Sequence, residues 1–447
     1  MHWLRLFGIK TFPHGIHPAE YKQQTSAKST RRLPFPPEVI LPLSQHIGKP
    51  SLPIVRKGQY VERGELIATA DGHLSVPLHA SVAGTVTDVG LMPSPLQTKA
   101  PAIVIKTSPD SGQVPLMGPK RDIDAMSRED LIAAVKETGM VGLGGAEFPT
   151  HAKMLIPEGY RVHTVIVNGC ECEPFITADH RVMLERVQHL LLGIRIAMKC
   201  TGAPRAIIGV EDNKRNVVET IRPALPNDGS ITLELVATKY PQGAEKMLVK
   251  SLLDVEIPSG GYPYMVGICV FNITTLTELG ALLPNSQGMI ERTVTITGDD
   301  LQKVGNFRVP IGAPLRHVLE FAGLTGDHIE LVLGGPMMGL PTASLDTPVI
   351  KGIGSVLVLD QRATRRSEIY PCIKCARCVQ ACPLSLNPSL LGQLAAKHQY
   401  ELMASRYHLN DCFECGSCTY VCPANIPLVQ YFRIAKAMNR KKHAHGS

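Results

Sequence analysis

Two copies of one cysteine motif restrict what the C-terminal part of this chain can form. Eight of its twelve cysteines belong to them: Cys372-x-x-Cys375-x-x-Cys378-x-x-x-Cys382-Pro383 and Cys412-x-x-Cys415-x-x-Cys418-x-x-x-Cys422-Pro423. The first residues of the chain lack the long apolar core and the cleavage site of a secretory signal. Thiols crowded together in a chain without an export signal indicate metal ligands rather than disulfides.

The spacing within each copy is that of bacterial two-cluster ferredoxins, in which the fourth cysteine of one copy serves the cluster of the other copy. We therefore expect two [4Fe–4S] clusters. The first would be held by Cys372, Cys375, Cys378 and Cys422, and the second by Cys412, Cys415, Cys418 and Cys382. Zinc is the alternative, but tetrahedral zinc sites use cysteine pairs or cysteine with histidine. They do not explain two identical sets of three plus one that end in proline.

Between the two copies, residues 390–405 have a helical pattern. The segment 365–437 therefore resembles the α-helical two-cluster ferredoxin domains of respiratory dehydrogenases. Residues 438–447 follow it as a basic tail.

Length and composition describe a globular chain of several domains. The 447 residues are 44% hydrophobic and 19% charged, which suggests roughly three or four domains. The net charge of +7 has no Lys/Arg-rich block until the last residues, so a nucleic-acid partner is disfavoured. The longest uncharged stretch, 257–277, contains prolines and glycines that do not suit a membrane-spanning helix. We expect a cytoplasmic chain.

The N-terminal half begins with a proline-rich arm, residues 1–37, followed by short Val/Ile-rich strands over residues 38–112. These strands resemble the barrel-sandwich fold of biotinyl and lipoyl domains, because Gly58, Gly64 and Gly84 lie at the positions of its turns. Such domains carry one modified lysine on a hairpin tip. No lysine occurs between Lys57 and Lys99, so we expect an unmodified structural relative.

Further along, strands and helices alternate. Residues 115–285 contain amphipathic helices, such as REDLIAAVKETG and a long one over residues 179–202, between buried strands. This alternation predicts a doubly wound, Rossmann-like α/β domain. Residues 290–360 read as strand, strand, helix and strand, and resemble a β-grasp module of the kind that binds soluble ligands beside flavin domains. Any small α+β domain is the alternative.

Several loops of the α/β domain lie where its strands end. Residues 142–153 (GLGGAEFPTHAK) are glycine-rich, so backbone N–H groups can approach a phosphate, and Lys153 can add a positive charge. NGCECEP (168–174), YPQGAEK (240–246) and FNITT (271–275) are further loops of this kind. Ligands of open α/β sheets bind at the carboxyl ends of the strands. A ligand site at this edge is therefore expected.

The same loops carry a specific resemblance. GLGGAEFPTHAK is similar to GRGGAGFPTGLK, the flavin-loop pattern of the flavoprotein subunit of respiratory complex I. NGCECEP is similar to that family's NADEGEP, and YPQGAEKMLVKSL to its Y-x-x-GEETALxxSL. With a biotinyl-like module before and the cysteine repeat after, the chain resembles the RnfC family of the Rnf electron-transport complex, also called Rsx, from about Thr11 to about Ala437.

This resemblance implies a peripheral protein, without a transmembrane segment, on the cytoplasmic face of the bacterial inner membrane. Members of the family carry FMN, two [4Fe–4S] clusters and the NAD(H) site, and their complex moves electrons between ferredoxin and NAD, coupled to ion translocation. The implied partners are NAD(H) and the other subunits of the membrane complex, including a ferredoxin-type iron–sulfur subunit.

The resemblance also implies site residues by position. Phe148 and Glu173 would lie near the nicotinamide nucleotide. The chain departs from the complex I pattern at Leu143, Cys170 and Ala244, where that pattern has Arg, Asp and Glu. The residues implied for FMN are Gly142, Gly144, Gly145, Lys153, Asn168, Glu171, Gly243, Glu245 and Asn272.

These parts belong together chemically. NADH gives up two electrons as a hydride, whereas each cluster accepts one, and a flavin can accept two and release one at a time. No general base or nucleophile is required. One alternative is a flavoprotein subunit of a soluble NAD-linked hydrogenase or formate dehydrogenase, which the order of the modules disfavours. The other is a non-catalytic iron–sulfur scaffold, which the intact Gly142, Gly144, Lys153 and Glu173 disfavour.

Overall fold

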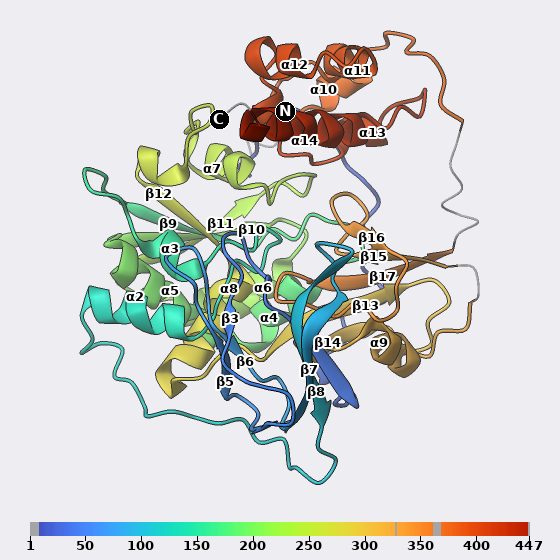
Figure 1. Cartoon of the computed structure of the whole chain (residues 1–447). Helices are drawn as coiled ribbons and strands as arrows, with labels where there is room; N and C mark the ends of the chain where they lie inside the picture. The colour runs from blue at the N-terminus through green and yellow to red at the C-terminus, as the bar shows by residue number, and fades with distance from the viewer. Residues whose placement is uncertain (1–8, 327–328, 361–367, 446–447) are drawn as a thin grey trace.

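The computed structural model describes residues 9–326, 329–360 and 368–445. Three parts that contain sheets pack against one another, and a helical part lies across one end of them, at the top of Figure 1. Among the described residues, no helix combines the length and the apolar character needed to cross a membrane.

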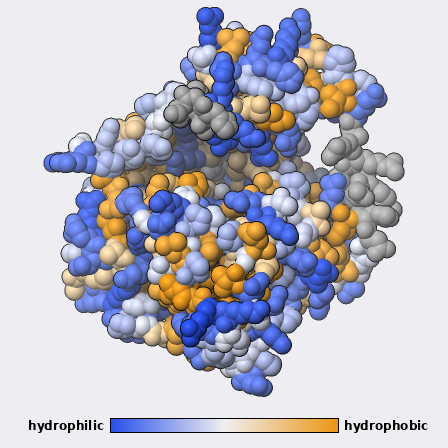
Figure 2. Space-filling view, viewed as in Figure 1, coloured by the Kyte–Doolittle hydropathy of each residue, from blue (hydrophilic) through white to orange (hydrophobic). Residues whose placement is uncertain are grey.

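The barrel-sandwich part consists of two small antiparallel sheets. Gly58 and Gly64 have φ of 85° and 94°, which are left-handed turn conformations, and a Cβ on Gly84 would lie 2.0 Å from the carbonyl oxygen of Lys106. Figure 2 shows apolar side chains gathered over this part of the surface, where Leu52 and Ile54 are exposed. One sheet has the strand order β2 (Glu38–Pro42), β8 (Lys99–Thr107), β7 (Gly84–Pro93) and β4 (Tyr60–Val61), and the other β3 (Leu52–Pro53), β5 (Leu66–Thr69) and β6 (Leu78–His79).

The α/β part contains a four-stranded, entirely parallel sheet. Its strand order is β11 (Ile231–Val236), β10 (Arg205–Glu211), β9 (Thr164–Asn168) and β12 (Ile268–Asn272). The strands β9, β10 and β12 are short, apolar and mostly buried, as expected for a parallel sheet covered by helices on its faces, whereas the edge strand β11 is partly exposed. The helices of this part are α2 (Arg128–Glu137), α3 (Thr150–Met154), α4 (Ala178–Glu185), α5 (Val187–Thr201), α6 (Arg215–Ile221), α7 (Glu245–Leu253) and α8 (Ile273–Leu282), with short 3-10 turns at Arg222–Ala224, Pro263–Val266 and Leu283–Asn285.

The long helix expected over residues 179–202 is in fact two helices, α4 and α5. Arg186 separates them with φ of −136° and ψ of 37°, and its guanidinium lies 2.5 Å from the buried carboxylate of Glu278 in α8. Further along α5, a Cβ on Gly193 would lie 1.8 Å from the carbonyl oxygen of Leu276. This glycine is needed because the backbones of α5 and α8 cross in direct contact.

The third sheet has six strands and includes a strand from the N-terminal arm. Arm residues Arg31–Arg32 (β1) pair with β14, a contribution that the irregular sequence of the arm did not predict. The helix α9 (Leu315–Ala322) packs its apolar residues onto the core of this part. The strand order is β1, β14 (Gly305–Pro310), β13 (Glu291–Gly298), β17 (Ser355–Asp360), β15 (Ile329–Leu333) and β16 (Leu340–Thr342).

The helical part contains both cysteine motifs. The helical pattern of residues 390–405 forms two helices rather than one, because His398 adopts a left-handed conformation with φ of 55°. Asn387 caps the first of them by accepting a hydrogen bond from the N–H of Leu390. The elements are α10 (Arg377–Ala381), α11 (Pro388–Ala396), α12 (Tyr400–Arg406), a 3-10 turn (Leu409–Asp411), α13 (Ser417–Tyr420) and α14 (Leu428–His445), which includes most of the basic tail.

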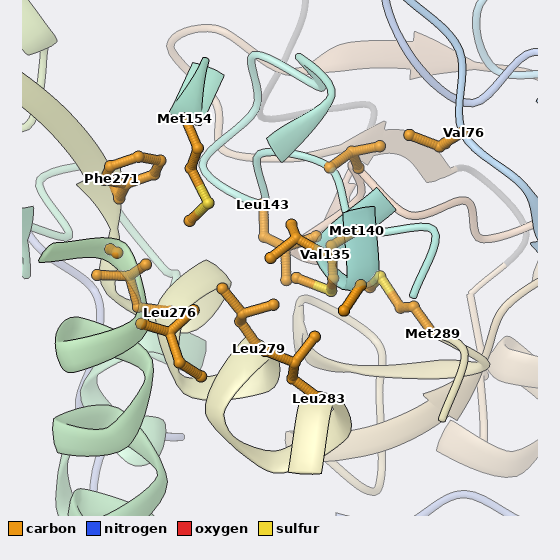
Figure 3. Close-up of a cluster of buried hydrophobic side chains, with 14 of the residues drawn as sticks. Val76, Val135, Met140, Leu143, Met154, Phe271, Leu276, Leu279, Leu283 and Met289 are labelled. Atoms are coloured by element: carbon orange, nitrogen blue, oxygen red, sulfur yellow. The ribbon is translucent and has the colours of Figure 1, made fainter. Parts of the chain in front are cut away.

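The largest hydrophobic core is continuous between the barrel-sandwich and α/β parts. The cluster includes Val76 of the former, and Figure 3 shows Val135 of α2 beside Met140, with Leu279 of α8 below them and Val76 at the upper right. This shared core holds the barrel-sandwich part against the segment that follows α2, where the candidate site begins.

Candidate functional site

The candidate site lies at the carboxyl ends of the parallel strands. Asn168 and Asn272, the last residues of β9 and β12, are directly opposite each other in the strand register. The amide of Asn168 donates a hydrogen bond of 2.7 Å to the carbonyl of Gly243. Asn272 caps α8 by accepting from the N–H of Thr275 at 3.1 Å. The parallel sheet therefore brings three separate loops to one edge.

The glycine loop, residues 142–148, closes as a small hairpin beside this edge. The N–H of Gly142 donates to the carbonyl of Phe148 at 2.9 Å, and the N–H of Leu143 donates to the hydroxyl of Thr275 at 2.9 Å. A Cβ on Gly144 would lie 3.1 Å from the Cβ of Asn272. The loop is thus fastened to the start of α8.

The tip of the glycine loop suits an anion. Gly145 has φ of +96° and is exposed, and a Cβ there would meet nothing within 4 Å. Within the described part of the chain, the backbone N–H groups of Gly144, Gly145 and Ala146 have no hydrogen-bond partner. Consecutive unpaired N–H groups around a left-handed glycine form a concavity that binds phosphates.

Leu143 explains one departure from the complex I pattern. Its side chain is 4% exposed and points into the hydrophobic core among Val135, Met140 and Leu279, as Figure 3 shows. An arginine with this orientation would bury its charge. In this chain the position serves packing, and the positive charge beside the loop is that of Arg292, whose guanidinium lies 3.5 Å from the carbonyl oxygen of Leu143.

Lys153 and Glu245 form an ion pair at the site. The Nζ atom of Lys153, in α3, lies 2.6 Å from a carboxylate oxygen of Glu245, in the first turn of α7. Nζ also lies 5.7 Å from the centre of the Phe271 ring. The two side chains are 31% and 38% exposed, so a ligand can reach them from solvent. The structure therefore places these two predicted site residues in contact with each other.

Gly243 occupies a place where no side chain fits. A Cβ on it would lie 2.7 Å from the carbonyl oxygen of Cys170. Its N–H donates to the thiol of Cys172 at 3.4 Å. Gly243 thus joins the loop after β9 to the loop before α7 by backbone contact.

Glu171 directs its carboxylate to a helix rather than to the open edge. It is 6% exposed and accepts hydrogen bonds from the N–H of Asp179 at 2.7 Å and of His180 at 3.3 Å, at the start of α4. Burial raises the pKa of this carboxyl to about 7. Glu171 therefore holds α4 against the loop after β9.

Glu173 likewise has partners inside the protein. Its two carboxylate oxygens accept hydrogen bonds from the N–H groups of Met337 at 3.1 Å and Met338 at 2.9 Å, in the segment between β15 and β16. Burial raises the pKa of the carboxyl to about 7. Glu173 joins the α/β part to the third sheet, and Phe148 lies half-buried at the end of the glycine loop.

Three polar residues of this edge were not predicted. Asp179 accepts from the amide of Asn272 at 2.7 Å and from the hydroxyl of Thr274 at 2.5 Å, so it orients the cap of α8. Glu211, the last residue of β10, forms a buried ion pair with Lys214. Glu211 could have been found from the sequence, because it lies at the end of a predicted strand. Asp179 follows its loop by several residues and offered no such signal.

The first cysteine set, Cys372, Cys375, Cys378 and Cys422, lines a cavity of about 230 Å³. Its other walls come mainly from apolar side chains, including Ile426, Leu428 and Tyr431. Cys382, the fourth cysteine of the first motif, does not line this cavity. The arrangement brings three thiols of one motif together with the last thiol of the other.

The second cysteine set, Cys412, Cys415, Cys418 and Cys382, is more deeply enclosed. Cys382, Cys415 and Cys418 are buried, whereas Cys372 and Cys375 of the first set are exposed. Burial and the neighbouring thiols Cys415 and Cys382 raise the pKa of Cys412. Among the described residues, no group of three His, Cys, Asp or Glu is placed to hold a single metal ion.

A testable consequence concerns Glu147 in the glycine loop. Burial raises the pKa of this carboxyl from 4.5 to about 7, although Arg292 opposes the shift. The folded protein therefore binds this proton more tightly than the unfolded chain, and stability falls as pH rises from about 4.5 to 7. We expect Glu147→Gln to unfold like the parent at pH 4.5 and to be about 1–3 kcal/mol more stable at pH 8.

Denaturant melts at both pH values, followed by far-ultraviolet circular dichroism, check this expectation. Glu129→Gln, at an exposed position on α2, is the matched control. An equal difference at both pH values would contradict the assigned titration of Glu147.

Comparison with protein families finds three matches along the chain. The RnfC barrel sandwich hybrid domain matches residues 10–110, the Nuo51 FMN-binding domain matches 135–281, and the 4Fe-4S dicluster domain matches 371–426. The second match includes the glycine loop and the ends of β9 and β12, and the third includes both cysteine sets.

Similar proteins carry consistent names. The chain is 39% identical to the C subunit of the proton-translocating ferredoxin:NAD(+) oxidoreductase complex of Clostridium ljungdahlii, over 97% of this chain and 94% of that protein. It is 36% identical to the Na(+)-translocating counterpart of Acetobacterium woodii, over 95% and 96%. Among solved structures, an NAD+-reducing [NiFe]-hydrogenase in the H2-reduced state aligns with a TM-score of 0.50 and 21% identity, over 70% of this chain and 63% of that one. The last likeness is one of fold.

Proposed function

Because this chain belongs to the RnfC family, the C subunits of ion-translocating ferredoxin:NAD(+) oxidoreductase complexes, we propose that it is the NAD(H)-reactive subunit of such a complex. It passes electrons between NAD(H), FMN and two [4Fe–4S] clusters, and other subunits couple this transfer to ion translocation. The observation that carries the proposal is that one chain contains both a glycine loop at the edge of a parallel sheet and two sets of four cysteines, of which the first lines a cavity and the second is largely buried.

The chemistry requires both kinds of site. FMN supplies the conversion between a two-electron hydride and single electrons. The chain's own residues bind it, exclude water and hold the thiolates in place. No residue of the candidate site is required as a general base or nucleophile.

We assign the FMN phosphate to the N–H groups of the glycine loop, with Gly142, Gly144 and Gly145 allowing close approach and Lys153 adding charge. The free N–H groups at 144–146 and the partly exposed Lys153 support this assignment. Asn168, Gly243, Glu245 and Asn272 complete the pocket. Glu171 affects the pocket indirectly, because its carboxylate holds the first turn of α4 in place.

The clusters are assigned to the two cysteine sets as crossed ligands. Cys372, Cys375, Cys378 and Cys422 hold the first, and Cys412, Cys415, Cys418 and Cys382 hold the second. A cavity lined by all four thiols of the first set, and not by Cys382, supports the crossing.

We also propose finer descriptions of two parts. The parallel order β11-β10-β9-β12 supports a Rossmann-like domain over residues 115–285. The strands and the single helix α9 support a β-grasp module over residues 290–360. The barrel-sandwich module covers residues 38–112 and the two-cluster domain residues 365–437, of which 365–367 lie outside the described residues.

Location and partners follow from the family. We propose that the chain is peripheral on the cytoplasmic face of the inner membrane. There it contacts other subunits of the complex, including a ferredoxin-type iron–sulfur subunit. Isolation of the chain with its partners, followed by identification of the co-purified proteins, tests this. Recovery with hydrogenase or formate dehydrogenase subunits would favour the alternative of a soluble NAD-linked enzyme.

The central test is an anaerobic visible spectrum of the purified chain with and without NADH. Bleaching of flavin and cluster absorbance on addition of NADH is expected. Clusters without flavin, and no change on addition of NADH, would instead identify an iron–sulfur scaffold.

Glu173→Gln is expected to retain FMN and to slow flavin reduction by NADH about 10-fold. We place Glu173 and Phe148 near the nicotinamide nucleotide. A glutamine has only one acceptor oxygen, so one of the bonds to the N–H groups of Met337 and Met338 is lost and the side chain is held less firmly. Stopped-flow bleaching beside flavin content measures both effects. Reduction at the parent rate would remove Glu173 from the nicotinamide site.

A further inference from the structure

A buried contact joins the α/β part to the second cysteine set. Tyr240, between β11 and α7, is 1% exposed, and its hydroxyl donates a hydrogen bond of 2.6 Å to the backbone carbonyl of Cys415. Ile16, Tyr240, Ala381 and Cys415 form one buried cluster, and Cys172 packs against it. The loop after β9, which carries Cys172, thus meets the cysteines of the helical part at this point.

Both sides of the contact are held by further bonds. The backbone of Tyr240 exchanges two hydrogen bonds of 2.8 Å with Ile16 of the N-terminal arm. On the other side, a Cβ on Gly416 would lie 3.0 Å from the carbonyl oxygen of Met337. The loop around Cys415 is therefore fixed between the α/β part and the segment that Glu173 binds.

We infer that Tyr240 is a positioning residue that holds the ligand loop of the second set against the α/β part, so that electrons cross between FMN and the clusters at Cys172, Tyr240 and Cys415. The inference rests on the proposed function, because it takes FMN and the clusters to exchange electrons. Tyr240 itself forms and breaks no covalent bond and is not oxidised. NADH supplies the electrons, which reach the second set one at a time.

The chemical state of the hydroxyl suits this role. Its partner is a backbone carbonyl, which can only accept, so the hydroxyl is the donor of this bond. Its hydrogen places positive charge toward the Cys415 loop, which favours the more negative, reduced state of a cluster there.

The relative burial of the two cysteine sets indicates which cluster exchanges electrons with the FMN site first. Cys415 lies in the contact with the α/β part, whereas Cys372 and Cys375 of the first set are exposed. Electron transfer slows steeply with distance, so the second set exchanges electrons with the FMN site. The exposed first set then faces solvent or a partner.

Tyr240→Phe tests the inference in the whole chain, reconstituted without oxygen with FMN, iron and sulfide. We expect parent iron content and parent flavin reduction by NADH. Cluster reduction should be threefold to tenfold slower, and the potential of the second cluster should be lower. A tenfold change in a one-electron equilibrium corresponds to about 59 mV, which a redox titration followed by electron paramagnetic resonance resolves.

A second measurement needs no cluster. In the cluster-free chain, amide hydrogen exchange of residues 412–418 should be at least threefold faster in Tyr240→Phe than in the parent. Tyr160→Phe, at a 43% exposed tyrosine of the α/β part, should match the parent throughout. Parent values of potential, cluster reduction and exchange in Tyr240→Phe would overturn the inference. If the parent itself is not reduced by NADH, the proposed function fails, while the exchange result still decides the role of Tyr240.

Discussion

Cys378→Ala will lower the iron and the acid-labile sulfide of the anaerobically purified chain from about eight atoms each to about four. Cys378 is one of the four thiols that line the 230 Å³ cavity, and three thiolates leave one iron of a cubane without a protein ligand. Three thiols of the second set, Cys382, Cys415 and Cys418, are buried, and no cysteine of that set lines the cavity. We therefore expect the second cluster to remain.

The crossed ligation can be tested with the same measurement. Cys422→Ala should abolish the same electron paramagnetic resonance signal as Cys378→Ala, although the two cysteines belong to different motifs. Cys382→Ala should abolish the other signal. Loss of one and the same signal in Cys378→Ala and Cys382→Ala would show instead that each motif holds its own cluster.

A cysteine outside the two sets provides the control. Cys200 is buried in α5, within the core of the α/β part. Cys200→Ala should keep both clusters and lose only some stability. Zinc bound at both sets, with no acid-labile sulfide, would contradict the cluster assignment altogether.

Lys153→Ala will weaken FMN binding by roughly 10- to 100-fold, the second large effect. A charge-assisted hydrogen bond to a phosphate contributes about 1.5–3 kcal/mol, and each 1.4 kcal/mol is a factor of about ten in affinity. Leu143 stands where the complex I pattern has an arginine, and a leucine carries no charge that could replace the one lost. Flavin released on dilution, measured by its fluorescence, gives the dissociation constant.

Glu245, the ion-pair partner of Lys153, affects how FMN binding by Lys153→Ala is interpreted. Without Lys153, the carboxylate of Glu245 is left unpaired beside the proposed phosphate site, and its repulsion would add to the loss. Lys153→Ala combined with Glu245→Gln removes that repulsion, and Lys153→Arg keeps the charge. We expect the double variant to remain at least tenfold weaker than the parent and the arginine variant to stay within about threefold. Full FMN occupancy of Lys153→Ala under dilution would exclude this phosphate site.

The two [4Fe–4S] clusters could be predicted from the sequence because the information in each cysteine motif is local. Each motif places three thiols within seven residues, which a single loop can gather. The fourth ligand required the known spacing of two-cluster ferredoxins.

The parallel sheet could also be predicted, because buried Val/Ile strands alternate with amphipathic helices in the sequence. The same reasoning predicted one helix in place of α4 and α5, and one in place of α11 and α12. Hydrophobic periodicity does not detect a break between helices such as that at Arg186, whose side chain forms an ion pair with Glu278, far along the chain.

The sequence by itself thus determined the barrel-sandwich module, the FMN-binding domain and the two-cluster domain, and it located the loops at the sheet edge. Only the tertiary structure decided which side chains of those loops remain available. Glu171 and Glu173 are engaged by N–H groups of α4 and of the third sheet, and Leu143 packs into the core. The same holds for Tyr240, whose hydroxyl reaches Cys415 across 175 residues. Hydrogen bonds and packing between segments that are far apart in the sequence depend on how the modules pack against one another, and no local sequence pattern predicts that packing.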